Sequence, residues 1–172
     1  MSTLITEHLE LSPLTARTAE LLTRDTVAPA CRLGATLAAT WPSPLLLDVL
    51  RLRPPTSPET ERFGVWVMVE RAGRVVVGDI GFKGPPDAQG CIELGYGVVA
   101  DRRRRGYATE AVRALVGWVQ TQPGVHAVVA TCDANNLPSI AMADSTGRRN
   151  ECTKTLGICT LRIGANKKYP YS

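Results

Sequence analysis

Apolar residues recur along this chain with two different spacings, which predict strands in some stretches and helices in others. Runs rich in valine, isoleucine and aromatic residues predict strands at Phe63–Arg71, Val75–Phe82, Ile92–Val99 and Ala127–Cys132. Between the last two, apolar positions one helical turn apart predict an amphipathic helix over Tyr107–Gln120. The pattern therefore predicts a mixed α/β domain, in which an antiparallel meander leads into a β-α-β crossover with two parallel neighbouring strands.

The N-terminal part of the chain has a mainly helical pattern. A short strand at Glu7–Leu11 is expected to stop at Pro13. Helical spacing then follows over Thr15–Leu22, over Ala30–Ala39 and from Pro42 to Leu52. The proline-rich stretch 53–58 predicts a break before the first long strand. We interpret residues 15–52 as helices that cover a ligand site.

Regular patterning fades toward the C-terminus. A last helix is predicted at Pro138–Ser145, and beyond Gly147 the alternation of Cys159, Leu161 and Ile163 predicts a single short strand. The whole chain, 1–172, is expected to be one domain. We divide it into an N-terminal strand with helices (1–62), a core (63–145) and an atypical tail (146–172).

The composition indicates a globular protein and argues against a disordered or membrane-spanning one. Of the 172 residues, 44% are hydrophobic and 21% are charged, which is typical of a globular domain rather than a disordered one. No apolar stretch approaches the length of a membrane span, and no signal peptide is recognisable, so we expect a cytoplasmic protein. Five widely spaced cysteines argue against a disulfide framework, and two histidines provide no recognisable zinc set.

The net charge of the chain is +4, and its positive residues cluster in the arginine run Arg102–Arg105, which points to a binding site for an anion. This run lies between a predicted strand that ends at Val99 and a helix that begins near Gly106. Free N–H groups and the positive dipole end make a helix start an anion site, and Gly106 and Ala108 let an anion approach the backbone. The pattern therefore favours a phosphate-bearing ligand, the alternative being a solvated basic loop before an ordinary helix.

The same segment resembles the acetyl-CoA motif of the GNAT N-acetyltransferase superfamily. Arg103, Gly106 and Ala108 occupy the fixed positions of its pattern, Arg/Gln-x-x-Gly-x-Gly/Ala. The surrounding GYGVVADRRRRGYATEAV is similar to the branch of RimJ- and RimL-type ribosomal-protein alanine acetyltransferases. Downstream, TCDANNLPSI resembles that family's strand and N-x-x-S segment, represented here by Asn136 and Ser139. The resemblance is strong over residues 63–145 and weak outside them.

The resemblance implies a fold, a co-substrate and a reaction. The fold is a central mixed, mostly antiparallel sheet flanked by helices, with acetyl-CoA as the co-substrate and no metal. The pantetheine arm is expected at the backbone of Val98, with Asn136 near it. The pyrophosphate is expected at the backbone N–H groups of Arg103, Arg104, Arg105, Gly106, Tyr107, Ala108 and Thr109. The implied reaction is direct attack of a primary amine on the thioester, without a covalent enzyme intermediate.

Candidate acid and base groups remain as alternatives. Glu93 is the candidate general base, on the expectation that partial burial raises its pKa, the alternative being a solvent-facing carboxylate. The tyrosine that relatives place after the second motif is missing from this chain. Ser139 is therefore the candidate acid, against the simpler role of capping a helix or binding the cofactor. Tyr96 and Tyr107 are weaker options, and His8, distant in sequence, is expected to be an ordinary strand residue.

The acceptor stays open between a protein N-terminus, a polyamine, an aminoglycoside and a small amine. A non-catalytic acyl-CoA-binding domain is the main alternative function. An RNA-binding role has less support, because the basic cluster is short and aromatic stacking motifs are missing. Relatives often dimerise, so a homodimer is an expectation. The family usually ends in a β-hairpin, which the tail after Gly147 is expected to lack.

Overall fold

The computed structural model describes residues 3–24, 27–133, 135–137, 139–141, 152–155 and 158–165. The strands are β1 (Leu4–Ile5), β2 (Leu9–Pro13), β3 (Thr36–Leu37), β4 (Val65–Glu70), β5 (Val75–Phe82), β6 (Cys91–Val98), β7 (Ala127–Asp133), β8 (Cys152–Thr155) and β9 (Ile158–Ala165). The helices are α1 (Ala16–Arg24), α2 (Val27–Leu33), α3 (Pro44–Leu52), α4 (Pro58–Arg62) and α5 (Tyr107–Val119), with a 3₁₀ turn, η1, at Ala100–Arg102.

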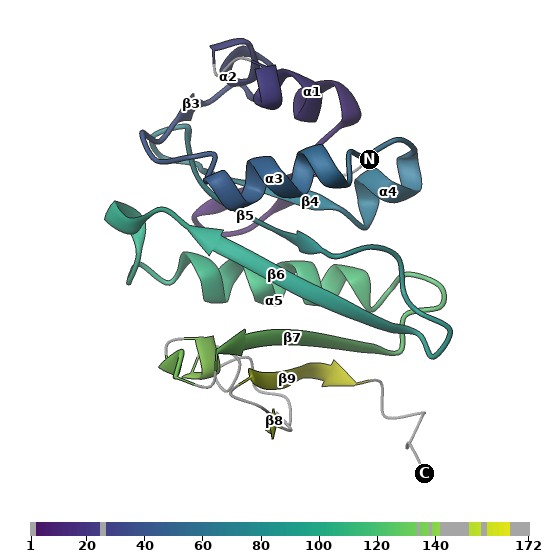
Figure 1. Cartoon of the computed structure of the whole chain (residues 1–172). Coiled ribbons are helices and arrows are strands. Elements are labelled where there is room, and N and C mark those ends of the chain that lie inside the picture. Colours follow the sequence, from purple (N-terminus) through teal and green to yellow (C-terminus); the bar gives the residue numbers. More distant parts are fainter. Residues whose placement is uncertain are drawn as a thin grey trace.

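The described strands form one sheet in the order β1-β2-β4-β5-β6-β7-β9-β8, with β3 added beside β5 (Figure 1). Neighbours along this order pair antiparallel except β6 and β7, which are parallel and joined through α5. The predicted meander and β-α-β crossover are therefore confirmed. The predicted range Val75–Phe82 coincides with β5, and the helix predicted from Tyr107 begins at that residue.

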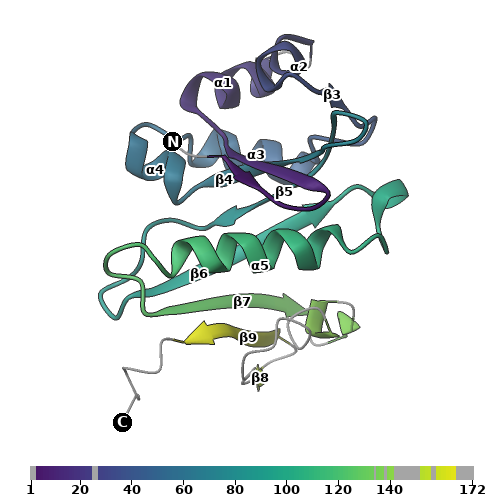
Figure 2. The same cartoon turned by 180° about the vertical axis from the view of Figure 1, so that it is seen from behind.

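Helices cover the two faces of the sheet differently. Helix α5 lies on one face, which Figure 2 shows from the front, whereas α3 lies over β4 and β5 on the other face (Figure 1). The apolar stripe of α5 is fully buried, and its members are Ala111, Val112, Leu115 and Val119. Trp118 on the same helix packs against Trp66 of β4 with ring centroids 4.9 Å apart. This contact holds the C-terminal part of α5 against the sheet.

Three N-terminal expectations need correction. Strand β2 continues through Pro13, which pairs with Trp66 of β4. The helix predicted at Ala30–Ala39 ends at Leu33, because Thr36 donates its N–H to the carbonyl of Arg74 (2.8 Å) and joins the sheet as β3. Within the expected break, Ser57 caps a short helix, α4, through a capping box.

The C-terminal expectation was also incomplete. Instead of one short strand, β8 and β9 pair antiparallel with each other, and β9 pairs with β7. A β-hairpin is therefore present. The sequence pattern missed it because these strands are defined by their pairing partners rather than by an alternation of apolar and polar residues. Cys159 on β9 is disulfide-bonded, which the wide spacing of the cysteines did not predict. The predicted helix Pro138–Ser145 falls largely outside the described residues.

Strands β6 and β7 pair over only part of their lengths. Their register joins Cys91–Leu94 to Ala127–Ala130, and no pairing between them is described beyond that point. Further along, β6 remains attached to β5 through Gly78 and Val98. Figure 1 shows the two strands diverging toward their carboxyl ends, at the same end of the sheet where α5 begins. The fold thus brings the carboxyl ends of both strands to a helix N-terminus.

Candidate active site

The first turn of α5 presents unpaired backbone donors. Its cap, Gly106, has a left-handed backbone (φ 82°), and no side chain caps the helix. The first helical hydrogen bond runs from the Glu110 N–H to the Gly106 carbonyl (3.0 Å). The N–H groups of Tyr107, Ala108 and Thr109 precede that bond and have no partner within the helix. A Cβ atom at Gly106 would meet no described atom within 4 Å, so the space beside the helix start is open at this position.

Glu70, the last residue of β4, anchors the basic loop. Its carboxylate, only 12% exposed, accepts two hydrogen bonds from Arg102 (2.9 and 3.1 Å). The Tyr107 hydroxyl also donates to Glu70, and this bond, followed by burial, raises the pKa of Tyr107. The sequence signal was slight, a carboxylate at the end of an otherwise apolar strand, and our interpretation missed it.

Replacing Glu70 with glutamine should therefore loosen the loop. We expect Glu70→Gln to lower the free energy of unfolding by about 2 kcal/mol, because the Arg102 guanidinium loses a charged acceptor. Urea denaturation measures this change. Glu20→Gln is the control, because Glu20 pairs with Arg17 and Arg24 on the exposed side of α1, and losing these pairs should cost under about 0.5 kcal/mol. If both substitutions lowered the free energy of unfolding equally, the proposal that Glu70 anchors the loop would be contradicted.

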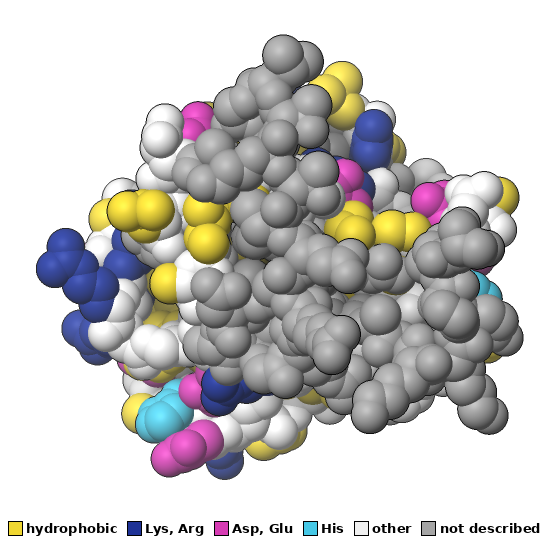
Figure 3. Space-filling model, turned by 90° about the horizontal axis from the view of Figure 1, so that it is seen from below, with side chains coloured by type: hydrophobic (Ala, Val, Ile, Leu, Met, Phe, Trp, Pro, Cys, Tyr) yellow, Lys and Arg dark blue, Asp and Glu magenta, His cyan; other side chains and the backbone are white. Residues whose placement is uncertain are grey.

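The other arginines of the run are placed differently from Arg102. Arg103 folds back and donates its Nε–H to the Val98 carbonyl (3.0 Å). Arg104 is exposed with a positive φ of 60°, and the guanidinium of Arg105 lies 4.0 Å from Glu70. Viewed from the side of β7 and β9, Lys and Arg side chains gather at the edge where β6 ends and α5 begins (Figure 3). The loop therefore presents positive charge beside the open helix start.

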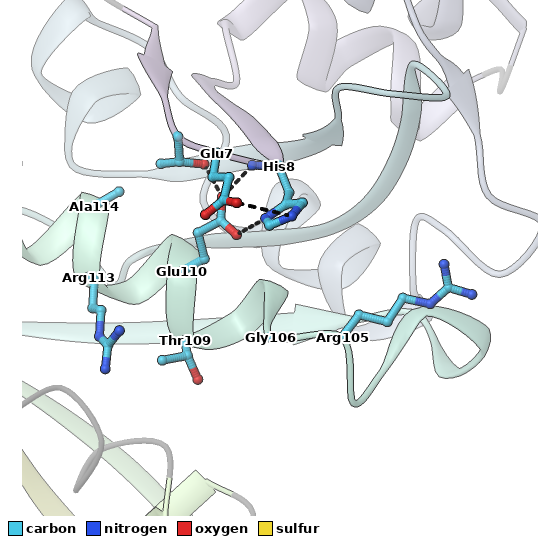
Figure 4. Close-up of a pocket in the computed structure, with 9 residues that line it drawn as sticks. Glu7, His8, Arg105, Gly106, Thr109, Glu110, Arg113 and Ala114 are labelled. Atoms are coloured by element: carbon cyan, nitrogen blue, oxygen red, sulfur yellow. Dashed lines mark hydrogen bonds and ion pairs between the residues drawn. The ribbon is translucent and has the colours of Figure 1, made fainter.

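An open hollow of about 760 Å³ lies beside the first turns of α5 (Figure 4). Glu110 projects from α5 toward the turn between β1 and β2, and accepts from Thr6 Oγ1 (2.5 Å), the His8 N–H (2.8 Å) and His8 Nδ1 (3.0 Å). Burial alone raises the pKa of Glu110, but these contacts outweigh it and leave the pKa below its usual value. His8, expected to be an ordinary strand residue, thus ties the N-terminal turn to the helix of the motif.

Two of the candidate acids meet where β6 and β7 diverge. The Tyr96 hydroxyl donates to Ser139 Oγ (2.9 Å), which links β6 to the segment after β7. Burial is the main cause that raises the pKa of Tyr96. Ser139 in turn donates its N–H to Asn136 Oδ1 (3.2 Å). The structure therefore brings Tyr96 of β6 together with Ser139 and Asn136 of the segment after β7.

Glu93 lies outside that group. Its Oε1 accepts from Lys83 Nζ (2.5 Å), just beyond the end of β5, and from Thr131 Oγ1 (2.5 Å) of β7. Burial raises the pKa of Glu93, but the hydrogen bonds from Lys83 and Thr131 and the charge of Lys83 leave it below the usual value. The expected upward shift of this pKa is wrong, because a cation compensates the partial burial.

Asp79 on β5 is a carboxylate that our sequence interpretation did not single out. It accepts a hydrogen bond from Trp41 Nε1 (3.0 Å), and burial raises its pKa to about 6 despite this bond. The sequence signal was available, an aspartate inside a run of valine and glycine. Its partner Trp41, however, lies 38 residues away, between two of the predicted helices.

Other site types receive no support in the part of the chain that the structure describes. No group of three or more His, Cys, Asp or Glu residues there is arranged to hold a metal ion. Among the described helices, none combines the length and apolar character that a bilayer span requires. Cys31 and Cys132 are free thiols.

Known N-acetyltransferases resemble this chain in sequence. In sequence, the chain is 34% identical over 88 residues to YjdG, an uncharacterized N-acetyltransferase of Bacillus subtilis (strain 168). That match covers 51% of this chain and 52% of the relative, so the chain spans about half the length of this curated relative. A second B. subtilis N-acetyltransferase, YnaD, is 30% identical over 59 residues, which is 34% of this chain and 35% of the relative.

Solved structures share the fold over nearly the whole chain. The ribosomal-protein-S5-alanine acetyltransferase of Vibrio fischeri superposes with a TM-score of 0.66 at 14% identity, covering 99% of this chain and all of that one. RimL, an L7/L12 α-N-protein acetyltransferase solved with coenzyme A, gives 0.64 at 14% identity, covering 94% and 97%. The family model described as "Acetyltransferase (GNAT) domain" matches residues 9–149. On this match, which includes the uncapped helix start and the diverging strands, the chain belongs to the GNAT acetyltransferase family.

Proposed function

We propose that this protein transfers the acetyl group of acetyl-CoA to a primary amine. The observation that carries the proposal is the open N-terminus of α5, where three backbone N–H groups follow an exposed, left-handed Gly106 inside a GNAT domain. Converging N–H groups, the helix dipole and the neighbouring arginines suit a pyrophosphate. Acetyl-CoA supplies both that diphosphate and the acyl group.

The cofactor-binding residues follow from this placement. We assign the pyrophosphate to the backbone N–H groups of Arg103–Thr109, and the pantetheine arm to the space where β6 and β7 diverge, beside Val98. Asn136, next to Ser139 at the end of β7, is assigned to the same arm. The Val98 carbonyl accepts from Arg103 in the structure, so the arm would compete with that guanidinium for the strand.

The reaction that we propose is direct attack of the amine on the thioester. The amine nitrogen forms a bond to the carbonyl carbon, the carbon–sulfur bond breaks, and the thiolate of CoA leaves and takes up a proton. Tyr96, hydrogen-bonded to Ser139 at the diverging strands, is the group that we assign to that proton transfer. A phenol carries its proton at neutral pH, as an acid must, and burial raises the pKa of Tyr96 further in that direction. Glu93, held by Lys83 and Thr131, is assigned to positioning β6 rather than to accepting a proton.

Removing the Tyr96 hydroxyl tests this assignment. We expect Tyr96→Phe to lower kcat by about 100-fold, because the leaving thiolate loses its proton source, while acetyl-CoA binding stays unchanged. Ser139→Ala keeps the phenol and should lower kcat less. Steady-state rates combined with calorimetric acetyl-CoA affinities separate the two effects. Unchanged kcat in Tyr96→Phe, or a larger loss in Ser139→Ala, would contradict the assignment.

The proposed activity is tested by CoA release. Purified protein is incubated with acetyl-CoA and, in turn, peptides with free N-termini, polyamines, aminoglycosides and small amines, and the released thiol is quantified with a chromogenic disulfide. We expect release that depends on one class of acceptor, with the acetylated product confirmed by mass spectrometry. If acetyl-CoA binds but every acceptor fails, the chain is an acyl-CoA-binding domain without transfer activity.

A further inference from the structure

Asp79 is a carboxylate without a described ion-pair partner on the face of the sheet opposite α5. Its neighbours Ile80 and Phe82 alternate onto the α5 face, where the Phe82 ring stacks on Trp118. Asp79 therefore faces the side of α3, where Trp41 donates to its Oδ1 (3.0 Å). In the sheet it lies between Val67 of β4 and Gly97 of β6, so neither flanking position brings a charge.

Two glycines of β6 lie beside Asp79, so the backbone there has no side chains on this face. Gly95 and Gly97 alternate onto the same face of β6 as Asp79. A Cβ at Gly95 would meet no described atom within 4 Å, and one at Gly97 would meet only the two carboxylate oxygens of Asp79, at 3.8 and 3.9 Å. A ligand can therefore lie directly on the β6 backbone here, with the Asp79 carboxylate at its edge. This stretch follows Leu94, the last residue that pairs β6 with β7.

A second carboxylate on the same face provides an internal comparison. Glu93 precedes Gly95 by two residues on β6, and its oxygen is already occupied by Lys83 and Thr131. Asp79 instead has Trp41, a neutral donor, and its pKa is raised where that of Glu93 is lowered. Two carboxylates whose environments separate their pKa values are a common arrangement where one of them handles a proton. Both carboxylates lie near the open backbone at Gly95, but of the two only Asp79 has no described cation on its oxygens.

We propose that Asp79 binds the ammonium group of the acceptor over Gly95 and Gly97 and takes the proton that the amine must lose before it attacks. The inference rests on the proposed acetyl transfer. The carboxylate accepts a hydrogen bond from the ammonium and then its proton, which leaves a neutral amine and a protonated Asp79. The amine attacks the thioester carbon, the C–S bond breaks, and the amide forms as CoA leaves as a thiol. Asp79 then releases its proton to solvent, so transfer yields one proton for each ammonium acetylated.

Asp79→Asn tests the inference, because asparagine keeps the shape and an oxygen for Trp41 but cannot take a proton. We expect kcat/KM at neutral pH to fall by about 100-fold, with acetyl-CoA affinity unchanged. In the wild type, kcat/KM should rise through a pKa near 6 and fall above the pKa of the acceptor amine, because ammonium and ionised Asp79 must meet. In Asp79→Asn the limb near pH 6 should disappear. A limb that persists unchanged in this variant overturns the proposal.

Two further variants test the same proposal if Asp79→Asn folds poorly. Trp41→Phe removes a hydrogen bond that lowers the Asp79 pKa, so the acidic limb should move to higher pH. Glu93→Gln should leave that limb in place. A limb lost in Glu93→Gln, or unmoved in Trp41→Phe, assigns the proton to another group and overturns the proposal. If the wild type transfers no acetyl group at all, the proposed function itself fails, which is a different outcome from an active enzyme insensitive to Asp79.

Discussion

Replacing Gly106 with tryptophan is expected to weaken acetyl-CoA binding by about 100-fold, equivalent to ~2.7 kcal/mol of binding free energy. Two effects act together. The indole would project into the open space beside the N–H groups of Tyr107, Ala108 and Thr109, because even a Cβ atom at Gly106 meets no described atom within 4 Å. The left-handed backbone at φ 82° also disfavours any residue with a Cβ, which disturbs the helix start. Isothermal titration calorimetry measures the affinity.

Gly124 provides a control with matched backbone strain. It has φ 79°, its Cβ position is equally open, and it lies just beyond the opposite end of α5. Gly124→Trp should therefore lose similar stability and keep wild-type affinity for acetyl-CoA. Thermal unfolding confirms that the two variants are comparably folded. Equal loss of affinity in both variants would mean that strain, rather than a blocked site, explains the effect at Gly106.

Replacing Gly78 with alanine is expected to lower the free energy of unfolding by about 3 kcal/mol. A Cβ at this position of β5 would lie 2.2 Å from the Gly97 carbonyl oxygen and 3.1 Å from the Val98 Cα. Both neighbours are backbone, so relief requires β5 and β6 to separate. Because Gly97 and Val98 border the proposed pantetheine arm and acceptor, the movement should also weaken acetyl-CoA binding. Urea denaturation and calorimetry measure the two consequences.

Gly117→Ala is the matched control for Gly78→Ala. Gly117 is exposed within α5, and a Cβ there meets no described atom within 4 Å. Alanine in a helix interior is favoured over glycine, so this variant should gain about 0.5–1 kcal/mol. Opposite signs are thus expected for the same chemical change. A Gly78→Ala variant as stable as the wild type would show that β5 and β6 are less closely packed than described.

The parts of the site that depend on local sequence were predictable. The start of α5 at Tyr107 follows from a helical period that begins after a glycine, and such signals lie within a few residues of each other. The parallel pairing of β6 and β7 follows from the crossover between them. Both expectations are confirmed, because neither needs information from distant parts of the chain.

The pairings that give the site its electrostatics were not predictable in this way. Asp79 lies 38 residues from Trp41, Tyr96 lies 43 from Ser139, and Glu70 lies 32 from Arg102. No sequence periodicity links positions so far apart. The side chain that compensates a buried charge is known only once the strands are paired in the sheet. Glu93 is an example. Its partial burial alone predicts a raised pKa, but in the folded protein Lys83 contacts the carboxylate and the pKa is lowered.

The most direct test of the central claim is a titration of isotopically labelled wild-type protein with acetyl-CoA, followed by amide nuclear magnetic resonance. If acetyl-CoA binds at the start of α5, the largest shifts should fall on the amides of Arg103–Thr109 and of Gly95–Val98. The amide of Gly124, beyond the other end of the helix, should remain in place. Absence of shifts at saturating acetyl-CoA, or shifts centred away from these two segments, would contradict the account.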